Sequence, residues 1–416
     1  MHKKKCDETS EGKNGIFNDS TSVLRGRISQ KSQKLSGKEI AICVTGSVAS
    51  IMSPKLAREL RRYGAEVRGY MTNAAVEYGV SPEVMEWATG HRPVLTLSGA
   101  IEHLQAFDVV LVYPATYNTI GKLASGIADN AVTTLCGAIE KDKLLIVPAM
   151  NLQLWTSPIL KENIHQLKKK GVTVVQPDFR EGMVKIAGVQ EVTDVIIVKS
   201  RTSRLKGRHV LILTGPLQYD IDPIRHVSSR STGKTGYYLS RESIHHGCET
   251  TVIYGPGQVE MPEGVKVYHV YSTEEMLDTA LQELKDHHYD IVLFPAAVLD
   301  FKPEAKPKGK IQSGQKQRFY LEPTPKIINN VNSQFPTLFT VGFKLLHNVK
   351  KDQLIETAHK ALKEQQSDII VANDLTKIHG EYHPAHFIDK DESFKSINAS
   401  KEKLAEHLFT KIESRM

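Results

Sequence analysis

Short apolar runs alternate with helical patterns twice along this chain of 416 residues. EIAICVTG, DVVLVYP and KLLIVPAM form a first series, and RHVLILTG, TTVIYGP, DIVLFPA and DIIVAND form a second series after residue 208. Buried parallel strands that are joined by helices give this appearance. The sequence therefore predicts an α/β fold with two successive open domains, each built on a mostly parallel sheet.

The domain boundaries follow from changes in composition. Residues 1–38 are rich in Lys, Ser, Asn and Gly and poor in large apolar groups, so they are predicted to form a disordered basic tail. The first domain is expected at 39–198, a polar linker at 199–208 around SRTSRLKGR, and the second domain at 209–416.

The net charge of +7 does not indicate a nucleic-acid partner. The tail holds nine basic and four acidic side chains, whereas the remaining 378 residues hold 45 basic and 43 acidic ones. A nucleic-acid-binding domain carries its basic excess on one face of the folded body. We therefore predict no nucleic-acid partner.

Other patterns exclude several classes of protein. No apolar run approaches the ~18 residues of a membrane span and no signal peptide is visible, so we expect a cytoplasmic protein without a membrane partner. The cysteines are far apart, which excludes a disulfide scaffold or a zinc ribbon. They are Cys6, Cys43, Cys136 and Cys248.

One histidine-rich segment, HGEYHPAH, has a spacing that could bind a metal. It contains His379, His383 and His386, but it reads as a loop with a proline, and the chain has 17 histidines. Chance clustering is the better interpretation, and no metal site is predicted.

The first domain contains three segments that could bind a ligand. In VTGSVAS (44–50), Gly46, Ser47 and Ala49 form a strand-to-helix turn whose N–H groups suit a phosphate, although every doubly wound fold has such a turn. PATYNT (114–119) and PAMNLQLW (148–155) follow the next two strands, at the edge where ligands bind in such sheets. His103 lies just before PATYNT, and alone it would more often be structural.

Together these segments resemble the homo-oligomeric flavin-containing cysteine decarboxylases. They are most similar to the decarboxylase half of the bifunctional phosphopantothenoylcysteine decarboxylase/phosphopantothenate–cysteine ligase family. The resemblance implies a flavodoxin-like domain with FMN as cofactor, which oxidises the cysteinyl side chain so that its carboxylate leaves as CO2. It assigns acid/base catalysis to His103 and binding of the substrate carboxylate to Asn151. The implied FMN-binding residues are Gly46, Ser47, Ala49, Thr72, Pro114, Ala115, Thr116 and Asn118.

One departure from that family concerns a substrate-binding flap. The common bacterial form carries an A-C-G motif there, whereas PDFREGMVKIAGVQ (177–190) has no cysteine and looks like the archaeal branch. The final proton donor is therefore unassigned. Lys185 is a candidate, although a solvated lysine is the favoured interpretation.

In the second domain, ILTGPLQYDIDPIRHVSSRSTGKTG (212–236) looks built for anions. Asp222-Pro223-x-Arg225 precedes a turn rich in Ser, Thr and Gly that opens a helix, where backbone amides can meet a phosphate. Lys234 and Arg225 would add positive charge. The segment is not a Walker loop, because the G-x-x-x-x-G-K-[ST] spacing is absent.

PAAVLDFKP (295–303), GKIQSG (309–314), PTPKII (323–328), VGF (341–343) and VANDL (371–375) follow in an order that resembles the ligase half of the same family. The resemblance implies two Rossmann-like domains and a CTP-dependent ligase that uses Mg²⁺. There the carboxylate of 4′-phosphopantothenate attacks CTP, pyrophosphate leaves, and cysteine displaces CMP. Lys310 is the implied catalytic residue. The implied nucleotide-binding residues are Ser231, Gly233, Pro295, Ala296, Asp300, Lys310, Pro325, Lys326, Ile327, Ile328 and Phe343.

Three points stay open from the sequence. The family commonly has Asn where this chain has Ser229, so one half could have lost its activity. CTP and ATP are not distinguished. A regulatory flavoprotein that binds a phosphatase is the alternative of another class, whereas an NAD enzyme is disfavoured because no G-x-G-x-x-G is present. The resemblance also implies a homo-oligomer, with trimeric flavin domains and dimeric ligase domains.

Overall fold

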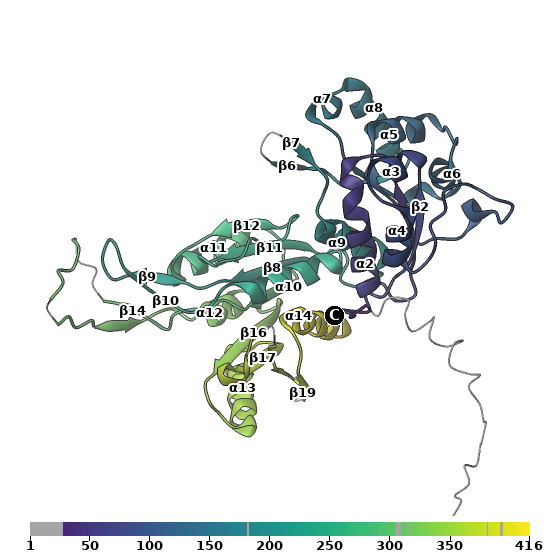
Figure 1. Cartoon of the computed structure of the whole chain (residues 1–416). Helices are drawn as coiled ribbons and strands as arrows, with labels where there is room; N and C mark the ends of the chain where they lie inside the picture. Colours follow the sequence, from purple (N-terminus) through teal and green to yellow (C-terminus); the bar gives the residue numbers. More distant parts are fainter. Residues whose placement is uncertain (1–27, 181–182, 305–308, 315, 381, 392–393) are drawn as a thin grey trace, which may run out of the picture. The chain divides into compact units, whose positions relative to one another are not determined.

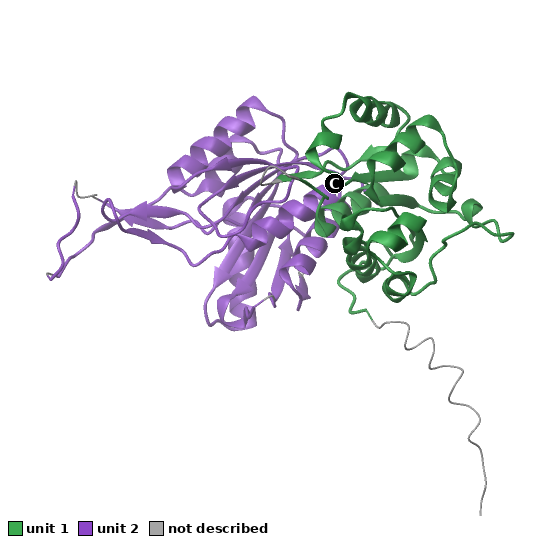
Figure 2. Cartoon of the chain, turned by 45° about the horizontal axis from the view of Figure 1, so that its top comes forward, with its two compact units in different colours: residues 1–200 green, residues 201–416 purple. Residues whose placement is uncertain are grey.

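The computed structural model describes residues 28–416 apart from 181–182, 305–308, 315, 381 and 392–393. The chain divides into two compact units, Met1–Ser200 and Arg201–Met416 (Figure 2). Within the described residues, none of the helices is both long enough and apolar enough to cross a membrane.

Unit 1 is built on a five-stranded parallel sheet in the order β2-β1-β3-β4-β5. The strands are β1 (Glu39–Val44), β2 (Glu66–Met71), β3 (Val109–Ala115), β4 (Leu144–Pro148) and β5 (Thr173–Val174). Every residue of β3 is buried, as expected for a strand that is covered on both faces. The order is that of a flavodoxin-like doubly wound fold, whose connections reverse direction between β1 and β3.

Helices cover both faces of this sheet. Alternate side chains of β1 enter two different cores: Ile40 and Ile42 pack with one set of helices, and Ala41 and Cys43 with the other. The helices are α2 (Ser53–Arg62), α3 (Asn73–Tyr78), α4 (Pro82–Thr89), α5 (Tyr117–Ser125), α6 (Ala131–Ala138), α7 (Leu152–Trp155), α8 (Pro158–Lys169) and α9 (Val189–Ser200), with short 3₁₀ segments η1 (Val48–Met52), η2 (Glu102–Leu104) and η3 (Lys141–Lys143). A small hairpin, β6 (Asp178–Arg180) and β7 (Met183–Lys185), precedes α9.

The predicted disordered tail is wrong over residues 28–38. Leu35 is fully buried in the core beneath α2. The N–H of Lys31 donates to the carbonyl of Arg62 at 2.8 Å, and the N–H of Leu35 donates to that of Tyr63 at 2.9 Å. One leucine in a polar run gives no periodic signal, so its burial could not be read from composition. Residues 1–27 of the predicted tail lie outside the described residues.

Unit 2 is built on an eight-stranded sheet in the order β12-β11-β8-β13-β16-β17-β18-β19. The six strands from β12 to β17 are parallel, and β18 and β19 add an antiparallel edge. The strands are β8 (His209–Thr214), β11 (Glu249–Tyr254), β12 (Lys266–His269), β13 (Ile291–Phe294), β16 (Phe339–Leu346), β17 (Ile369–Asp374), β18 (Ala385–Asp389) and β19 (Phe394–Ile397). This is the predicted Rossmann-like sheet. Successive strands are added outward from β8 on one side and from β13 on the other, so the topological switch point lies between these two strands.

The helices of unit 2 again lie against both faces. Val210 and Ile212 of β8 pack in one core with α10 and α14, whereas Leu211 and Leu213 pack in another with α11 and α12. The helices are α10 (Lys234–His245), α11 (Thr273–Asp286), α12 (Ile327–Gln334), α13 (Lys351–Gln365) and α14 (Lys401–Arg415), with the 3₁₀ segment η4 (Leu375–Lys377).

Two hairpins leave this α/β body side by side (Figure 1). β9 (Gln218–Asp220) pairs with β10 (His226–Ser228), and β14 (Phe301–Pro303) pairs with β15 (Leu321–Pro323). The first hairpin carries the Asp222–Arg225 segment at its turn. The second encloses the segment that contains Lys310.

Candidate active sites in the two units

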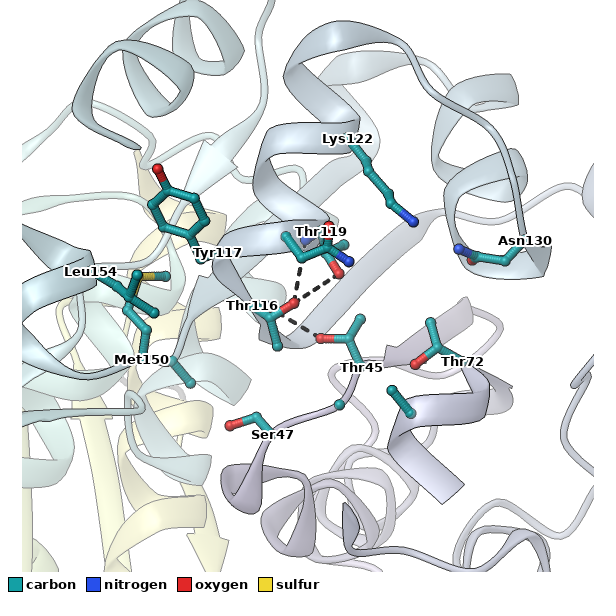
Figure 3. Close-up of a pocket in the computed structure, with 14 residues that line it drawn as sticks. Thr45, Ser47, Thr72, Thr116, Tyr117, Thr119, Lys122, Asn130, Met150 and Leu154 are labelled. Carbon is teal, nitrogen blue, oxygen red and sulfur yellow. Dashed lines mark hydrogen bonds between the residues drawn. The ribbon is translucent and has the colours of Figure 1, made fainter. Parts of the chain in front are cut away.

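A cavity of about 500 Å³ opens in unit 1 at the carboxyl ends of β1, β2, β3 and β4 (Figure 3). Its lining combines polar and apolar surface, and the larger apolar side chains lie together on one side. The lining residues are Thr45, Gly46, Ser47, Thr72, Ala74, Thr116, Tyr117, Asn118, Thr119, Lys122, Asn130, Ala149, Met150 and Leu154. The position is the one at which ligands bind in doubly wound sheets, next to the reversal point of the strand order.

Five of the ten predicted residues of this unit line the cavity: Gly46, Ser47, Thr72, Thr116 and Asn118. The other five lie outside that lining: Ala49, His103, Pro114, Ala115 and Asn151. Two of the latter still support the cavity wall through their backbones. The carbonyl of Pro114 accepts from the Thr45 hydroxyl at 2.7 Å, and that of Ala115 accepts from the N–H of Ala149 at 3.1 Å.

Several lining side chains are also helix N-caps. The hydroxyl of Ser47 accepts from the N–H of Ala49, that of Thr72 from Ala75, and that of Thr116 from Thr119, each at 3.3 Å. Asn130 caps α6 through its Oδ1, which accepts from the N–H of Thr133 at 3.1 Å. Because each cap lies on the cavity wall, these helices direct their partly positive amino ends toward it. The wall is therefore suited to an anionic or strongly polar group.

Sequence reasoning missed Lys122 and Asn130. Figure 3 shows both side chains on the same side of the cavity, beside Thr72. The Lys122 ammonium pairs with Asp129 at 2.5 Å, and the amide of Asn130 donates to the same carboxylate at 2.9 Å. An Asp-Asn pair just before an apolar helical run is an N-cap signal that could have identified Asn130. Lys122 lies mid-helix and gives no local signal.

The lining fits a flavin nucleotide. Hydroxyl, amide and ammonium groups can bind a phosphate and the polar edge of a ring, while Tyr117, Met150 and Leu154 offer apolar contact on the opposite side (Figure 3). Gly46 is packed tightly there, because a Cβ atom at this position would lie 2.5 Å from the Cβ of Ala74. The turn after β1 therefore presents bare backbone to the cavity.

His103 and Asn151, the two predicted catalytic residues of this unit, differ in their surroundings. His103 lies in η2, and its Nδ1 is buried without a hydrogen-bond partner among the described residues. Tyr70 fixes this segment by donating to the carbonyl of Glu102 at 2.7 Å, and burial raises the pKa of Tyr70 to about 12. Asn151 is exposed and caps α7, its Oδ1 accepting from the N–H of Leu154 at 2.9 Å. Lys185 is exposed on β7.

In unit 2, the predicted nucleotide-binding residues occupy several different elements. Pro295 and Ala296 come directly after β13, and the next residue, Ala297, bonds to the carbonyl of Gly215 beyond β8 at 2.9 Å. Ser231 and Gly233 precede α10, and Phe343 lies in β16.

The second predicted group lies at the start of α12. Lys326 pairs with Asp300 at 2.5 Å, and both side chains are exposed. Thr324, just before Pro325, donates from its N–H to the carbonyl of Asp300 at 3.0 Å. Ile327 is buried and Ile328 packs against the same core. The structure thus brings the predicted residues of the Asp300 and Pro325 segments together.

Lys310 is exposed, and its neighbour Ile311 is tied to the Asp222–Arg225 turn. Sequence reasoning expected Arg225 to add positive charge for an anion. Its guanidinium instead donates to the buried carboxylate of Asp222 at 2.6 Å and to the carbonyl of Ile311 at 2.8 Å. Ser229 is partly buried, and its hydroxyl accepts from the N–H of Ser231 at 3.4 Å.

The histidine-rich segment shows no metal-binding arrangement within the described residues, where no group of three His, Cys, Asp or Glu side chains could hold an ion. His386 contacts the hydroxyl of Ser396 at 2.9 Å. Burial, with a smaller contribution from Lys401, lowers the pKa of His383 to about 4.

The fold and the site define a two-unit α/β flavoprotein. The family described as "Flavoprotein" matches residues 28–201, and "DNA/pantothenate metabolism flavoprotein C-terminal domain" matches residues 205–416. The chain is 40% identical over 392 residues to the coenzyme A biosynthesis bifunctional protein CoaBC of Thermococcus kodakarensis, which covers 92% of this chain and 96% of the relative. It is 33% identical to the CoaBC protein of Methanocaldococcus jannaschii, over 94% and 97% of the two chains.

This chain belongs to the family of bifunctional coenzyme A biosynthesis proteins CoaBC. Among solved structures, it is similar to the DNA/pantothenate metabolism flavoprotein from Streptococcus pneumoniae, with a TM-score of 0.47 and 27% identity over 50% of this chain and 100% of that one. It is also similar to the FMN-dependent cysteine decarboxylase SpaF, with a TM-score of 0.36 and 28% identity over 40% and 99%.

Proposed function

We propose that this chain catalyses two successive steps of coenzyme A biosynthesis in the cytoplasm. Unit 2 ligates 4′-phosphopantothenate to cysteine, and unit 1 decarboxylates the phosphopantothenoylcysteine that results to 4′-phosphopantetheine. The observation that carries the proposal is that both units occur in one chain, 92% of which aligns with a bifunctional relative.

In unit 2, the ligation needs an activated carboxylate, because an amine does not displace oxide from a free acid. We infer that the carboxylate of 4′-phosphopantothenate attacks the α-phosphate of CTP, assisted by Mg²⁺, and that pyrophosphate leaves. The cysteine amine then attacks the acyl carbon and releases CMP. The exposed Lys310 ammonium would stabilise the charge that develops at the α-phosphate, and the backbone around Ser231 and Gly233 would bind phosphate at the start of α10.

In unit 1, the cavity would hold FMN through Ser47, Thr72, Thr116 and Asn118, with Gly46 allowing close approach. When bound, FMN supplies the two-electron oxidation that turns the cysteinyl carboxylate into a leaving group. Asn151 keeps its amide N–H₂ available for that carboxylate, because its Oδ1 is used as the cap of α7. His103 would move a proton at the reacting cysteinyl carbon.

We further propose that the flavin unit works as a trimer and the ligase unit as a dimer. His103 and Asn151 lie outside the cavity lining that the same chain provides. A neighbouring copy that supplies these two side chains would complete the catalytic set. Val48 and Ile51 of η1, next to the cavity, are exposed by 75% and 59%, and an interface would remove them from water.

The test is a coupled assay on the purified full chain with 4′-phosphopantothenate, cysteine, Mg²⁺ and either CTP or ATP, in which pyrophosphate and CO2 are followed separately. We expect a yellow protein that releases both products with CTP. Release of pyrophosphate without CO2 would show that only the ligase half is active, and the reverse would show the same for the decarboxylase half. A colourless protein that is inert even with added FMN and both nucleotides would contradict the proposal.

A further inference from the structure

We propose that Asp222 and Arg225 form a clamp on the backbone of Ile311 and thereby position Lys310 for nucleotide activation. The inference rests on the proposed ligase function, and it assigns to these two residues a positioning role and not a substrate contact. It replaces the interpretation in which Arg225 contributes charge to an anion site.

The clamp binds both backbone polar groups of Ile311. Its N–H donates to Oδ2 of Asp222 at 3.2 Å, and its carbonyl accepts from Nη2 of Arg225 at 2.8 Å. The two clamp residues are themselves joined, because Nε and Nη2 of Arg225 donate to the same Oδ2 at 3.0 and 2.6 Å. The N–H and the carbonyl of Ile311 are therefore both held by a turn that lies at least 86 residues earlier in the sequence.

The turn itself is rigid. Oδ1 of Asp222 accepts from the N–H of Ile224 at 2.9 Å and from that of Arg225 at 2.8 Å, and the N–H of Ile221 donates to the carbonyl of Arg225 at 2.7 Å. The Asp222 side chain is fully buried, whereas Arg225 is half exposed. Desolvation raises the pKa of Asp222, but the hydrogen bonds from Arg225 and from the three N–H groups outweigh it and hold the pKa well below its usual range. The carboxylate thus stays charged and available to Ile311.

Lys310 precedes the clamped residue directly, so its Cα moves with Ile311. The segment lies between two hairpin strands that are 17 residues apart in the sequence, and its described residues, 304, 309–314 and 316–320, form no helix or strand. Without the clamp, the long lysine side chain would start from a loosely held backbone. Displacement of a catalytic group by about 1 Å can reduce a rate by about 100-fold.

A direct contact between Arg225 and the substrate predicts different kinetics. A guanidinium that binds a phosphate would contribute to ground-state affinity, so its loss would raise KM, and its effect would multiply with that of Lys310. A positioning residue acts through Lys310, so its loss lowers kcat and adds little once Lys310 is gone. A double-mutant cycle separates the two roles.

The experiment measures nucleotide-dependent pyrophosphate release by the full chain and by the variants Asp222→Asn, Arg225→Lys and Lys310→Gln, together with each clamp variant combined with Lys310→Gln. We expect each clamp variant to lower kcat by about 10- to 100-fold with a change in KM below about 3-fold. The kcat of each double variant should equal that of Lys310→Gln alone. Asp391→Asn, which removes an exposed carboxylate that pairs with Arg415, is the matched control and should leave both constants unchanged.

Hydrogen exchange at the amide of Ile311 tests the clamp without any catalysis. We expect protection in the parent protein and loss of protection in Asp222→Asn. Equal protection in both would overturn the clamp, and so would an increased KM for Arg225→Lys with losses that multiply in the cycle. If the parent protein releases no pyrophosphate with either nucleotide, the proposed ligase function fails, and the exchange result alone then decides whether the clamp exists. If Asp222→Asn does not fold, the hydrogen exchange of Ile311 in Arg225→Lys is the deciding measurement. This variant keeps a cation at a half-exposed position.

Discussion

At the residue scale, Thr45 joins the ends of two strands beneath the cavity of unit 1. Its hydroxyl donates to the carbonyl of Pro114 at 2.7 Å and accepts from the N–H of Thr116 at 3.3 Å. The side chain and its bond to the Pro114 carbonyl are buried, whereas Thr116 is partly buried. The hydroxyl therefore fixes the turn after β1 relative to the helix that begins after β3.

Replacing Thr45 with Val should lower the free energy of unfolding of unit 1 by about 1–3 kcal/mol, because the buried carbonyl of Pro114 and the partly buried N–H of Thr116 lose their partner. FMN should also bind more weakly, since Thr45 and Thr116 both line the cavity. Thermal unfolding and a fluorescence titration with FMN measure the two effects. Thr156→Val is the matched control, because that exposed hydroxyl bonds only to carbonyls one turn earlier. Equal losses in both variants would argue against a linking role for Thr45.

His383 gives unit 2 a dependence on pH with a defined sign. Its folded-state pKa, about 4, lies below the ordinary 6.5, because burial and Lys401 disfavour the charged ring. Between these values, the unfolded chain binds a proton that the folded chain does not, so the free energy of unfolding falls as the pH falls, by at most about 1.4 kcal/mol per pH unit. His383→Gln should flatten this dependence in urea denaturation at pH 7 and pH 5. His379→Gln is the control, because His379 is exposed in the same segment. If the free energy of unfolding changed equally with pH in the parent protein and in His383→Gln, His383 would not have this role.

The sequence could predict those site residues that follow a strand directly. Gly46, Thr72 and Thr116 each come after a recognisable apolar run, and the fold brings such ends together. Lys122 and Asn130 reach the same cavity from the middle of α5 and the start of α6, positions that depend on how the helices pack. The partner of Arg225 could not be predicted either, because Ile311 is distant in sequence and bonds through its backbone.

At the element scale, one device recurs at the amino ends of the strands in both units. An aspartate just before a strand accepts through Oδ2 from an N–H at the start of the neighbouring strand, and it pairs with a Lys or Arg side chain through Oδ1. The three instances are Asp108 with Glu39 and Lys38, Asp290 with His209 and Arg208, and Asp368 with Thr340 and Lys390. Glu39 and His209 are the first residues of their strands and Thr340 is the second residue of β16, so each carboxylate gives a partner to a backbone N–H near a strand end.

The close packing of α10 on β8 leads to a prediction about the stability of unit 2. A Cβ atom at Gly236 would lie 2.1 Å from Oγ1 and 2.4 Å from Cγ2 of Thr214. Gly236→Ala should therefore destabilise unit 2 by about 1–3 kcal/mol and reduce ligase activity, since α10 begins beside Ser231 and Gly233. Thr214→Gly in the same chain should restore part of the stability, as measured by the midpoint of thermal unfolding.

Gly137 in α6 supplies the matched control, because a Cβ atom there would meet no atom within 4 Å. Gly137→Ala should be neutral or stabilise by up to about 1 kcal/mol, since alanine is the better helix former. If Gly236→Ala proved as harmless as Gly137→Ala, the close approach of α10 to β8 would be contradicted.

The elements themselves differ in how far the sequence revealed them. β3, β4, β8 and β17 are continuous apolar runs that bury both faces, so their composition sufficed. The hairpin β14/β15 joins three-residue strands across a long segment, and most of its residues are exposed. Neither alternation nor a short turn signal marks such a pair. Its existence follows from tertiary contacts, including those of β14 with β9.

At the scale of the whole molecule, the two units have separate interiors. Each hydrophobic cluster contains residues of one unit only: two clusters lie on the faces of the first sheet and three belong to the second unit. Among the described residues, each sheet therefore has a hydrophobic core of its own. The proposed sites also belong to separate sheets.

This independence predicts that the two activities can be removed one at a time. Gly46→Ala would force a contact with Ala74 in the cavity wall, so FMN affinity and CO2 release should fall, while pyrophosphate release should stay within about 2-fold of the parent. Lys310→Gln should do the opposite: the protein stays yellow and decarboxylates added phosphopantothenoylcysteine, but it releases pyrophosphate at only a small residual rate. Mixing the two purified variants should restore conversion of 4′-phosphopantothenate to 4′-phosphopantetheine, because the product of ligation can diffuse from one chain to the other. If each variant lost both activities while its unfolding midpoint was unchanged, the units would be coupled, and the separation of their cores would not describe how they work.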